Sequence, residues 1–329
     1  MPPPDPFDSR RPIAELLKEH QRRIDDLRWE CRDDIAADAD QFRDGLFLLR
    51  FVVSHKGDME AIIPAVKATI AWRVKHKDRL AALADGTAQP PHAAEFEKYN
   101  VAGPHKQMKT GEPILIVRIG LCNAELQMDH MSDEQVYEVF MFNKEYFYAL
   151  ADQRSRAQGR IVKMMSVMDL RHVAGRPDQR FMKAMGRASK ESEVFYPQLL
   201  AWTAVVNSPW WMRAAMSVAR LFMSKKSIEK MRFCSGKTYK DLIGNCPYVG
   251  SLLAPEDVPT FLGGTCRCPG GCVGGAPNEQ TTRRATPEED DERDRIRKGL
   301  VTAVTDETDE TPTADVAEAE STSDPSVES

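Results

Sequence analysis

The most informative stretch of the chain, which includes an almost wholly apolar helical pattern, lies between residues 195 and 233. Its segment Thr203–Asn207 (TAVVN) is short and β-branched, which is typical of a buried parallel strand. Ser208-Pro209 should end that strand, because the residue before proline avoids the helical region. From Trp210 to Ser224 the polar residues form one narrow stripe at helical spacing: Arg213, Ser217, Arg220 and Ser224. A helix with so little polar surface must be buried, cover an apolar cavity or face a membrane.

The remaining pattern predicts an α/β fold. Apolar positions at helical spacing predict helices over 11–34, 41–56, 58–79, 132–153 and 177–192. Runs of β-forming residues predict strands over 113–119, 161–169 and 202–207, with a short one near 233–234. Strands that alternate with helices imply a mostly parallel sheet with right-handed crossovers. We therefore expect an N-terminal helical segment followed by a mostly parallel sheet.

Composition adds an uneven distribution of charge. The chain of 329 residues has a net charge of −5. Residues 287–329 carry 15 acidic and 4 basic side chains, so the rest of the chain carries a net charge of +6. A mildly basic body suits contact with anionic lipid head groups, although an ordinary soluble domain with a solvated tail fits the charge equally well. We find no secretory signal and no apolar run near the ~20 residues of a membrane span.

The candidate chemical motifs are incomplete. Cys234–Thr238 (CSGKT) resembles half of a phosphate-binding loop, but Met231 stands where that loop needs its first glycine. Cys266, Cys268 and Cys272 supply three soft ligands, whereas a structural zinc site uses four, and no histidine is near in sequence. A glycine-rich loop with reduced thiols is the favoured interpretation, and metal binding is left open. The seven cysteines lack a secretory context and predict reduced thiols. Without a hydrolase or metalloprotease motif, we expect a protein that is not an enzyme and needs no cofactor.

Five blocks in order resemble the CRAL-TRIO lipid-binding family. They are Phe47–Lys77, KTGEPILIVRIG (Lys109–Gly120), VMDLR (Val167–Arg171), FYPQLL (Phe195–Leu200) and PTFLGGTCRCPGGC (Pro259–Cys272). The resemblance implies a sheet that floors a lipid pocket and a helical lid over it. It implies an N-terminal helical segment 10–83 and a lipid-binding domain 92–275. Composition predicts that segment 1–9 and the acidic tail 276–329 are disordered, because the tail has too little apolar surface to offset the loss of chain entropy.

The resemblance also implies a ligand site. Alignment through Tyr196-Pro197 places Gln198 where the family's phosphoinositide site has a glutamate, and Lys230 at its lysine. Ser227 falls where relatives have a threonine. Alignment through Asp169 puts Met164 and Ser166 at two hydroxyl positions of phosphatidylcholine-binding relatives, while Pro104 replaces their tyrosine. A solvated basic helix end, with Lys225, Lys226, Lys230 and Arg232 near a helix C-terminus, is the competing interpretation.

The predicted function is binding and intermembrane transfer or presentation of a phospholipid such as phosphatidylinositol. In the lid, Trp210, Trp211 and Phe222 are the predicted membrane contacts, and Lys225 and Lys226 would attract anionic lipid. The expected protein is a cytoplasmic monomer, transiently at membranes, without a nucleic-acid partner. The alternative is an adaptor of the same fold that acts with a small GTPase or its regulator.

Overall fold

A five-stranded sheet with the order β1-β2-β3-β4-β5 organises the protein. The computed structural model describes residues 5–37, 44–84, 87–171, 173, 178–208, 225–234, 253–269 and 271–273. The strands are β1 (Ala102–Gln107), β2 (Pro113–Arg118), β3 (Met164–Asp169), β4 (Leu200–Val206) and β5 (Met231–Phe233). β1 runs antiparallel to β2, and all other neighbours are parallel. The predicted α/β fold with a mostly parallel sheet is confirmed.

The helices begin and end at the expected chemical signals. They are α1 (Ile13–Glu30), α2 (Arg32–Ala37), α4 (Gly45–Ser54), α5 (Met59–Lys75), α6 (Lys77–Ala84), α7 (Ala93–Tyr99), α8 (Ala124–His130), α9 (Asp133–Gln158), α10 (Gln179–Phe195) and α12 (Lys225–Glu229), with short 3₁₀ turns at Ile119–Leu121, Pro255–Asp257 and Thr260–Leu262. Ser132 and Gln135 form a reciprocal capping box at the start of α9, and Gly159 ends it with a φ of 65°. Among the described helices, none has the length and apolarity needed to cross a membrane.

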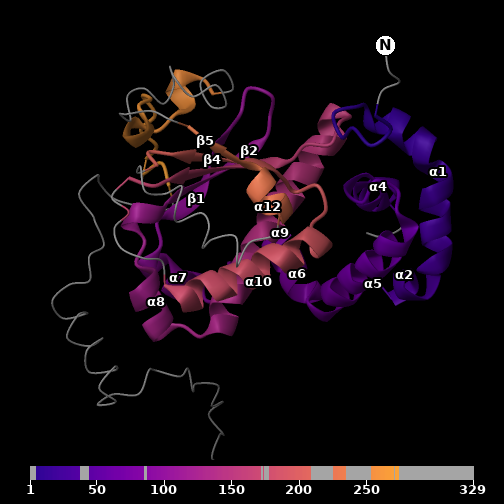
Figure 1. Cartoon of the computed structure of the whole chain (residues 1–329), viewed down its shortest axis with the longest axis horizontal. Helices are drawn as coiled ribbons and strands as arrows, with labels where there is room; N and C mark the ends of the chain where they lie inside the picture. The colour runs from indigo at the N-terminus through magenta and orange to yellow at the C-terminus, as the bar shows by residue number, and fades with distance from the viewer. Residues whose placement is uncertain are drawn as a thin grey trace, which may run out of the picture.

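The two faces of the sheet have different cover. One face carries Ile114, Met165 and Val167, which are buried against the C-terminal segment 253–273 through residues such as Val258 and Leu262. The opposite face looks toward α9 and α10, and Figure 1 shows the sheet between these helices and the orange C-terminal segment. Side chains alternate between the two faces along a strand, so residues such as Leu115, Ser166 and Met168 belong to this opposite face.

The N-terminal helices are joined to α9 and α10 by buried polar contacts. Arg73 of α5 donates to both carboxylate oxygens of Glu145 of α9 at 2.9 and 2.8 Å, and both side chains are buried. Thr69 Oγ1 also donates to the carbonyl of Val194 in α10. Residues 5–9 belong to a segment expected to be disordered, but in the structure the Phe7 ring stacks on His20 of α1 with 5.0 Å between centroids. Figure 1 shows these helices at one end of the molecule.

Candidate functional site

Three polar side chains meet in a cavity because each precedes a parallel strand. Lys163 stands immediately before β3, Gln198 two residues before β4, and Lys230 immediately before β5. The amino ends of parallel strands lie at the same edge of a sheet, so these residues converge there. The cavity measures about 240 Å³ and is lined by Ser54, Lys163, Gln198, Leu200, Ala201, Lys226, Glu229 and Lys230. The structure thus brings the predicted residues Gln198 and Lys230 together, and it adds Lys163, which the sequence analysis missed.

The backbone fixes both predicted residues in this cavity. Gln198 has a φ of 62°, in the left-handed region that residues with a side chain seldom adopt. It occupies the tight turn between α10 and β4, where the chain reverses after Pro197. The amide of Thr203 donates to the carbonyl of Lys230 at 3.0 Å, which ties the end of α12 to β4. The conformation and hydrogen bonding of the backbone thus position both residues at the cavity.

The cavity is electrostatically positive. Burial, followed by repulsion from Lys230, lowers the pKa of Lys163 to about 8. Burial also lowers the pKa of Lys230, and Lys226 lowers it further, while Glu193 acts in the opposite direction. With Glu229 as the one carboxylate among the lining residues, three lysines leave an excess of positive charge. An anion in the cavity would relieve this repulsion and form charge-assisted hydrogen bonds with the ammonium groups.

Two other predicted ligand residues lie apart from these lining side chains. Ser227 Oγ donates to Glu193 Oε1 at 3.0 Å and is 3.2 Å from Ser189 Oγ, so its hydroxyl faces α10. Ser166 is buried in the middle of β3. The geometry therefore supports Lys230 and Gln198 as a pair and gives Ser227 a contact that positions α12.

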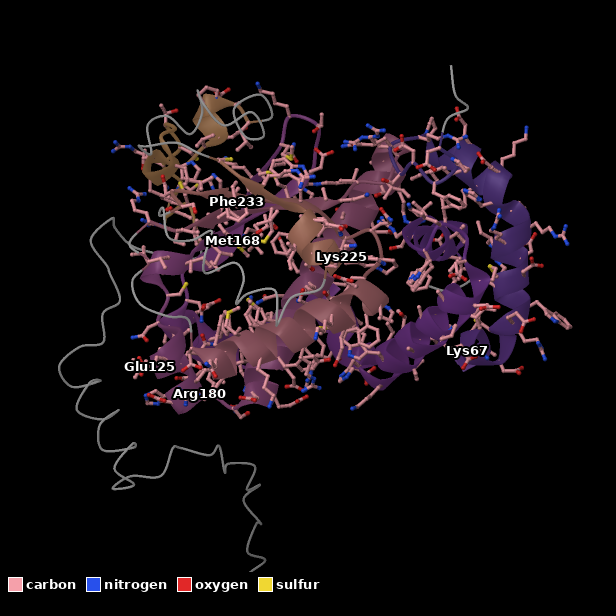
Figure 2. The ribbon with its side chains drawn as sticks, in the orientation of Figure 1. Lys67, Glu125, Met168, Arg180, Lys225 and Phe233 are labelled. Atoms are coloured by element: carbon pink, nitrogen blue, oxygen red, sulfur yellow. The ribbon has the colours of Figure 1, made fainter. Side chains whose placement is uncertain are left out.

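The predicted lid and membrane contacts fall mostly outside the described residues. Trp210, Trp211 and Phe222 all lie there. Lys225 and Lys226 begin α12, and both are exposed. Lys225 reaches Glu229 only at 3.9 Å with its side chain 91% exposed, as in a solvated helix end, and Figure 2 shows its position on α12. Lys230 differs, because it is half-buried and lines the cavity.

The second sheet face is an apolar surface that is only partly covered. Across the strands, Val117 pairs with Met168, Met168 with Val205, and Val205 with Phe233. The parallel row two residues earlier is Leu115, Ser166, Thr203 and Met231. Phe233 is 42% exposed, and Figure 2 labels it and Met168, which lie on β5 and β3 with Val205 of β4 between them. Methionine and phenylalanine at half-buried positions suit contact with flexible hydrocarbon chains.

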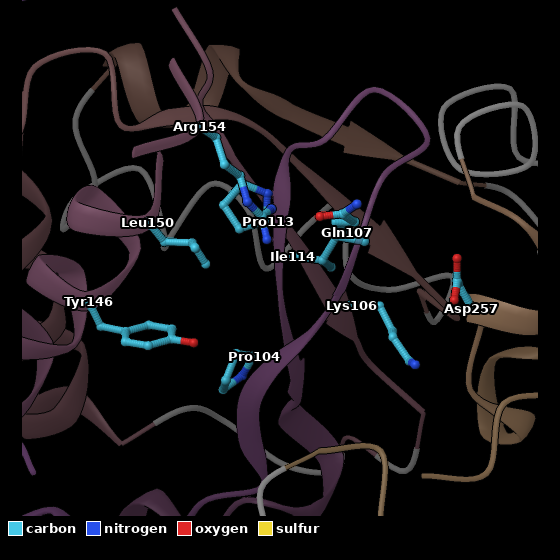
Figure 3. A pocket seen from close by; sticks show the side chains of 9 residues that line it. All are labelled: Pro104, Lys106, Gln107, Pro113, Ile114, Tyr146, Leu150, Arg154 and Asp257. Carbon is cyan, nitrogen blue, oxygen red and sulfur yellow. The ribbon is translucent and has the colours of Figure 1, made fainter. Parts of the chain in front are cut away.

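A second, larger cavity of about 540 Å³ lies between the β1–β2 hairpin and α9. It is lined by Pro104, Lys106, Gln107, Pro113, Ile114, Tyr146, Leu150, Arg154 and Asp257. Figure 3 shows Tyr146 of α9 pointing across it toward Pro104 of β1. Arg154 donates to the carbonyl of Gly111 at 2.7 Å and so closes one end against the hairpin. This cavity has two cations, Lys106 and Arg154, and one carboxylate, Asp257, and Arg154 already donates to the Gly111 carbonyl. The lysine cavity has three lysines for one carboxylate, and we place the candidate site there.

The cysteines differ in state. Cys31, Cys122, Cys266, Cys268 and Cys272 are free thiols. Cys234 is disulfide-bonded, so the expectation of reduced thiols throughout is wrong at this position. The fold decides which sulfur atoms meet, and a count of cysteines does not contain that information.

The comparisons with known proteins identify the family of this chain. The CRAL/TRIO domain family matches residues 97–264, and the chain belongs to this family. It is 26% identical over 240 residues to the Sec14 cytosolic factor of Schizosaccharomyces pombe, covering 70% of this chain and 77% of that protein. It is 24% identical to the phosphatidylinositol/phosphatidylcholine transfer protein SFH12 of Arabidopsis thaliana, covering 69% of this chain but 41% of the relative. A solved structure, the crystal structure of Sfh5, is similar with a TM-score of 0.45 and 12% identity, covering 65% of this chain and 79% of that one.

Proposed function

We propose that this protein binds a phospholipid and transfers it between membranes or presents it, with the anionic head group held in the lysine cavity. The observation that carries the proposal is the convergence of Lys163, Lys226 and Lys230 with the amide of Gln198 at one sheet edge. A phosphate monoester or diester would accept hydrogen bonds from the ammonium groups, and Gln198 has both a donor and an acceptor for a hydroxyl of the head group. Phosphatidylinositol combines these two features and is the ligand we propose.

The half-buried sheet face gives the acyl chains a place to lie. Val117, Met168 and Phe233 form an apolar surface beside the row of Leu115, Ser166, Thr203 and Met231, in which Ser166 and Thr203 carry the two hydroxyls. The segment 209–224, outside the described residues, joins β4 to α12 and is our proposed lid. Trp210, Trp211 and Phe222 are its proposed membrane contacts, because aromatic side chains favour the membrane interface. The names of two relatives support a phospholipid as the class of ligand.

Replacement of Lys230 by alanine tests the head-group site. We expect Lys230→Ala to slow transfer of phosphatidylinositol between vesicles about 10- to 100-fold, because a hydrogen bond to a charged group contributes about 1.5–3 kcal/mol. Lys225→Ala is the matched control, since Lys225 is on the same helix but is exposed and outside the cavity lining. The control should transfer at nearly the parental rate.

The same assay includes a neutral lipid and a lid variant. Transfer of phosphatidylcholine should slow less in Lys230→Ala than transfer of phosphatidylinositol, because the choline cation offsets the charge of its phosphodiester. Lys225→Ala should leave the transfer of both lipids nearly unchanged. Trp210→Ala combined with Trp211→Ala should slow transfer of both lipids while the melting temperature changes little. Native mass spectrometry of the purified chain should show a bound phospholipid. A clean mass for the protein alone, together with equal phosphatidylinositol transfer by Lys230→Ala and Lys225→Ala, would contradict the proposal and favour the adaptor alternative.

A further inference from the structure

Four potential metal ligands from distant parts of the sequence meet at the antiparallel edge of the sheet. Ligand atoms of His105, Cys268 and Cys272 all lie within 4.8 Å of one another. Cys266 Sγ is 3.5 Å from Cys268 Sγ. His105 belongs to β1, and the three cysteines belong to the end of the C-terminal segment. In the sequence the three cysteines lack a fourth ligand, and the fold provides it from a strand about 160 residues earlier.

The backbone holds the three cysteines in a tight loop that points their sulfur atoms inward. Cys266 forms an isolated bridge with Pro259, and its amide donates to the carbonyl of Val258 at 2.9 Å. The amide of Cys268 donates to Cys272 Sγ, with 3.4 Å between the atoms. The next turn closes through Gly271, which has a φ of 102°. Hydrogen bonds from the backbone of this kind orient the sulfur ligands of metal sites.

His105 is oriented by a backbone carbonyl. Its Nε2 is 2.8 Å from the carbonyl oxygen of Asp257, and the side chain is buried. A proton on Nε2 that is donated to this carbonyl leaves Nδ1 as the nitrogen that can bind a metal, an arrangement common for metal-binding histidines. An Nε2–H donated to Asp257 is the neutral imidazole form that a metal ligand must have.

We propose that His105, Cys266, Cys268 and Cys272 form a structural zinc site. Zinc in structural sites prefers four ligands in a tetrahedron, and three cysteines with one histidine are a common set. A Zn–S bond of about 2.3 Å places two sulfur ligands about 3.8 Å apart, close to the 3.5 Å between Cys266 and Cys268. Binding would displace the thiol protons and replace contacts between neutral sulfurs by bonds from thiolates to a cation. All four positions would be taken by protein, so the metal would have a structural role.

The consequence for the fold is a clamp between its first strand and its last described segment. The C-terminal segment supplies Leu253, Val258, Phe261, Leu262 and Val273 to the buried core on one sheet face. The zinc site would fasten this cover to β1, which otherwise joins the sheet through β2 alone. Closing a long loop restricts the unfolded chain, so a bound metal contributes directly to folding stability.

Elemental analysis of the full chain tests this inference. The protein is expressed with zinc in the medium and purified under reducing conditions without chelator. We expect about one zinc per chain, as for other four-ligand sites. Cys268→Ser, Cys272→Ser and His105→Ala should each lose the metal and melt at a lower temperature. Cys122→Ser is the matched control, because Cys122 is also a free thiol but lies outside the cluster, and it should keep the zinc.

Two measurements keep the test decisive if the ligand variants fold poorly. His105→Cys preserves four ligands and should retain zinc where His105→Ala does not. Wild-type protein loaded with Co²⁺ should show thiolate charge-transfer absorption and the intense visible bands of a tetrahedral site. The inference is wrong if the wild-type chain carries no zinc and gives no such cobalt spectrum. It is also wrong if intact mass under non-reducing conditions shows that two of the three cysteines form a disulfide, or if Cys268→Ser binds zinc as the parent does.

Discussion

Lys163 is a half-buried cation, and Glu229 is the one carboxylate among the side chains that line its cavity. Its pKa of about 8 lies below the usual 10.5, chiefly because burial disfavours the charged form. Such a charge lowers the stability of the ligand-free protein, and in our proposal it binds the anionic head group of the lipid. A side chain that lowers stability while it improves binding is a common property of functional sites.

Replacement of Lys163 by methionine should therefore separate stability from binding. We expect Lys163→Met to raise the free energy of unfolding of the ligand-free protein by on the order of 1 kcal/mol at pH 7, since a pKa unit corresponds to about 1.4 kcal/mol and solvent reduces the effect. Binding to vesicles that contain phosphatidylinositol should weaken at the same pH. Chemical denaturation and vesicle sedimentation measure the two effects. A variant that is both less stable and equally active would show that Lys163 has no role in the site.

The pH dependence of this difference has a defined sign. The folded-state pKa of Lys163, about 8, is lower than its usual value of 10.5. Between these two values the unfolded chain keeps a proton that the folded chain has lost, so the stability of the parent rises with pH. Below pH 8 the penalty is fully present. The advantage of Lys163→Met should therefore be constant below about pH 8 and disappear as the pH approaches about 10.5.

The sequence identifies some of these site residues and conceals others for a physical reason. Gln198 and Lys230 follow from the resemblance, because the Tyr196-Pro197 pair aligns both positions with the family's ligand site. Lys163 stands in IVKMM, which predicts a strand beginning at Ile161 and places the lysine within it. The strand begins at Met164 instead, so Lys163 is at the sheet edge. His105 is equally hidden, because its partners are joined to it only by tertiary structure.

At the level of elements, the strands with β-branched residues are those the sequence predicts. β2 and β4 have Ile, Val, Leu and Thr in short runs, and both appear within a few residues of the expected bounds. β1 has the sequence AGPHKQ, which has neither an apolar alternation nor a β-branched residue. Glycine and proline are tolerated there because β1 is the antiparallel edge strand, where one side of the backbone needs no partner. Only pairing with β2 makes this segment a strand.

The contact between α5 and α9 gives an element-scale prediction. Arg73 and Glu145 are a buried, bidentate ion pair. Glu145→Ala should lower the free energy of unfolding by about 3–5 kcal/mol, because it leaves the Arg73 charge buried without its partner. The double variant Arg73→Met, Glu145→Leu should lose much less, since both charges are removed and apolar volume is kept.

Urea denaturation measures these changes. The control is an exposed ion pair between α9 and α10. Glu134 at the start of α9 pairs with Arg187 of α10, with side chains 61% and 46% exposed. Glu134→Ala should cost less than about 1 kcal/mol, as for other exposed pairs. Equal losses for Glu145→Ala and Glu134→Ala would mean that the α5–α9 pair does not hold the N-terminal helices to the rest of the protein.

For the whole molecule, the distribution of charge separates the body from its tail. Residues 287–329 contribute 15 acidic and 4 basic side chains, and the rest of the chain has a net charge of +6. The proposed boundary at 275/276 follows the last described residue, Val273, whose side chain is buried in the core. Acidic residues after that point can compete with anionic membranes for the basic body, and such competition weakens as salt screens it.

Two truncations at nearby positions test this division of the chain. Removal of all residues after Gly275 should leave the melting temperature within about 1 °C, because too few apolar residues follow to form a packed core. Binding to anionic vesicles should be retained or increased at low salt, and the increase should vanish at high salt.

Removal of all residues after Thr265 is the matched comparison. It takes away Cys266, Cys268, Cys272 and buried Val273, and it should lower the melting temperature strongly. Differential scanning calorimetry distinguishes the two outcomes. A large loss of stability in the longer form would show that the acidic tail packs on the body and that the boundary lies further along the chain.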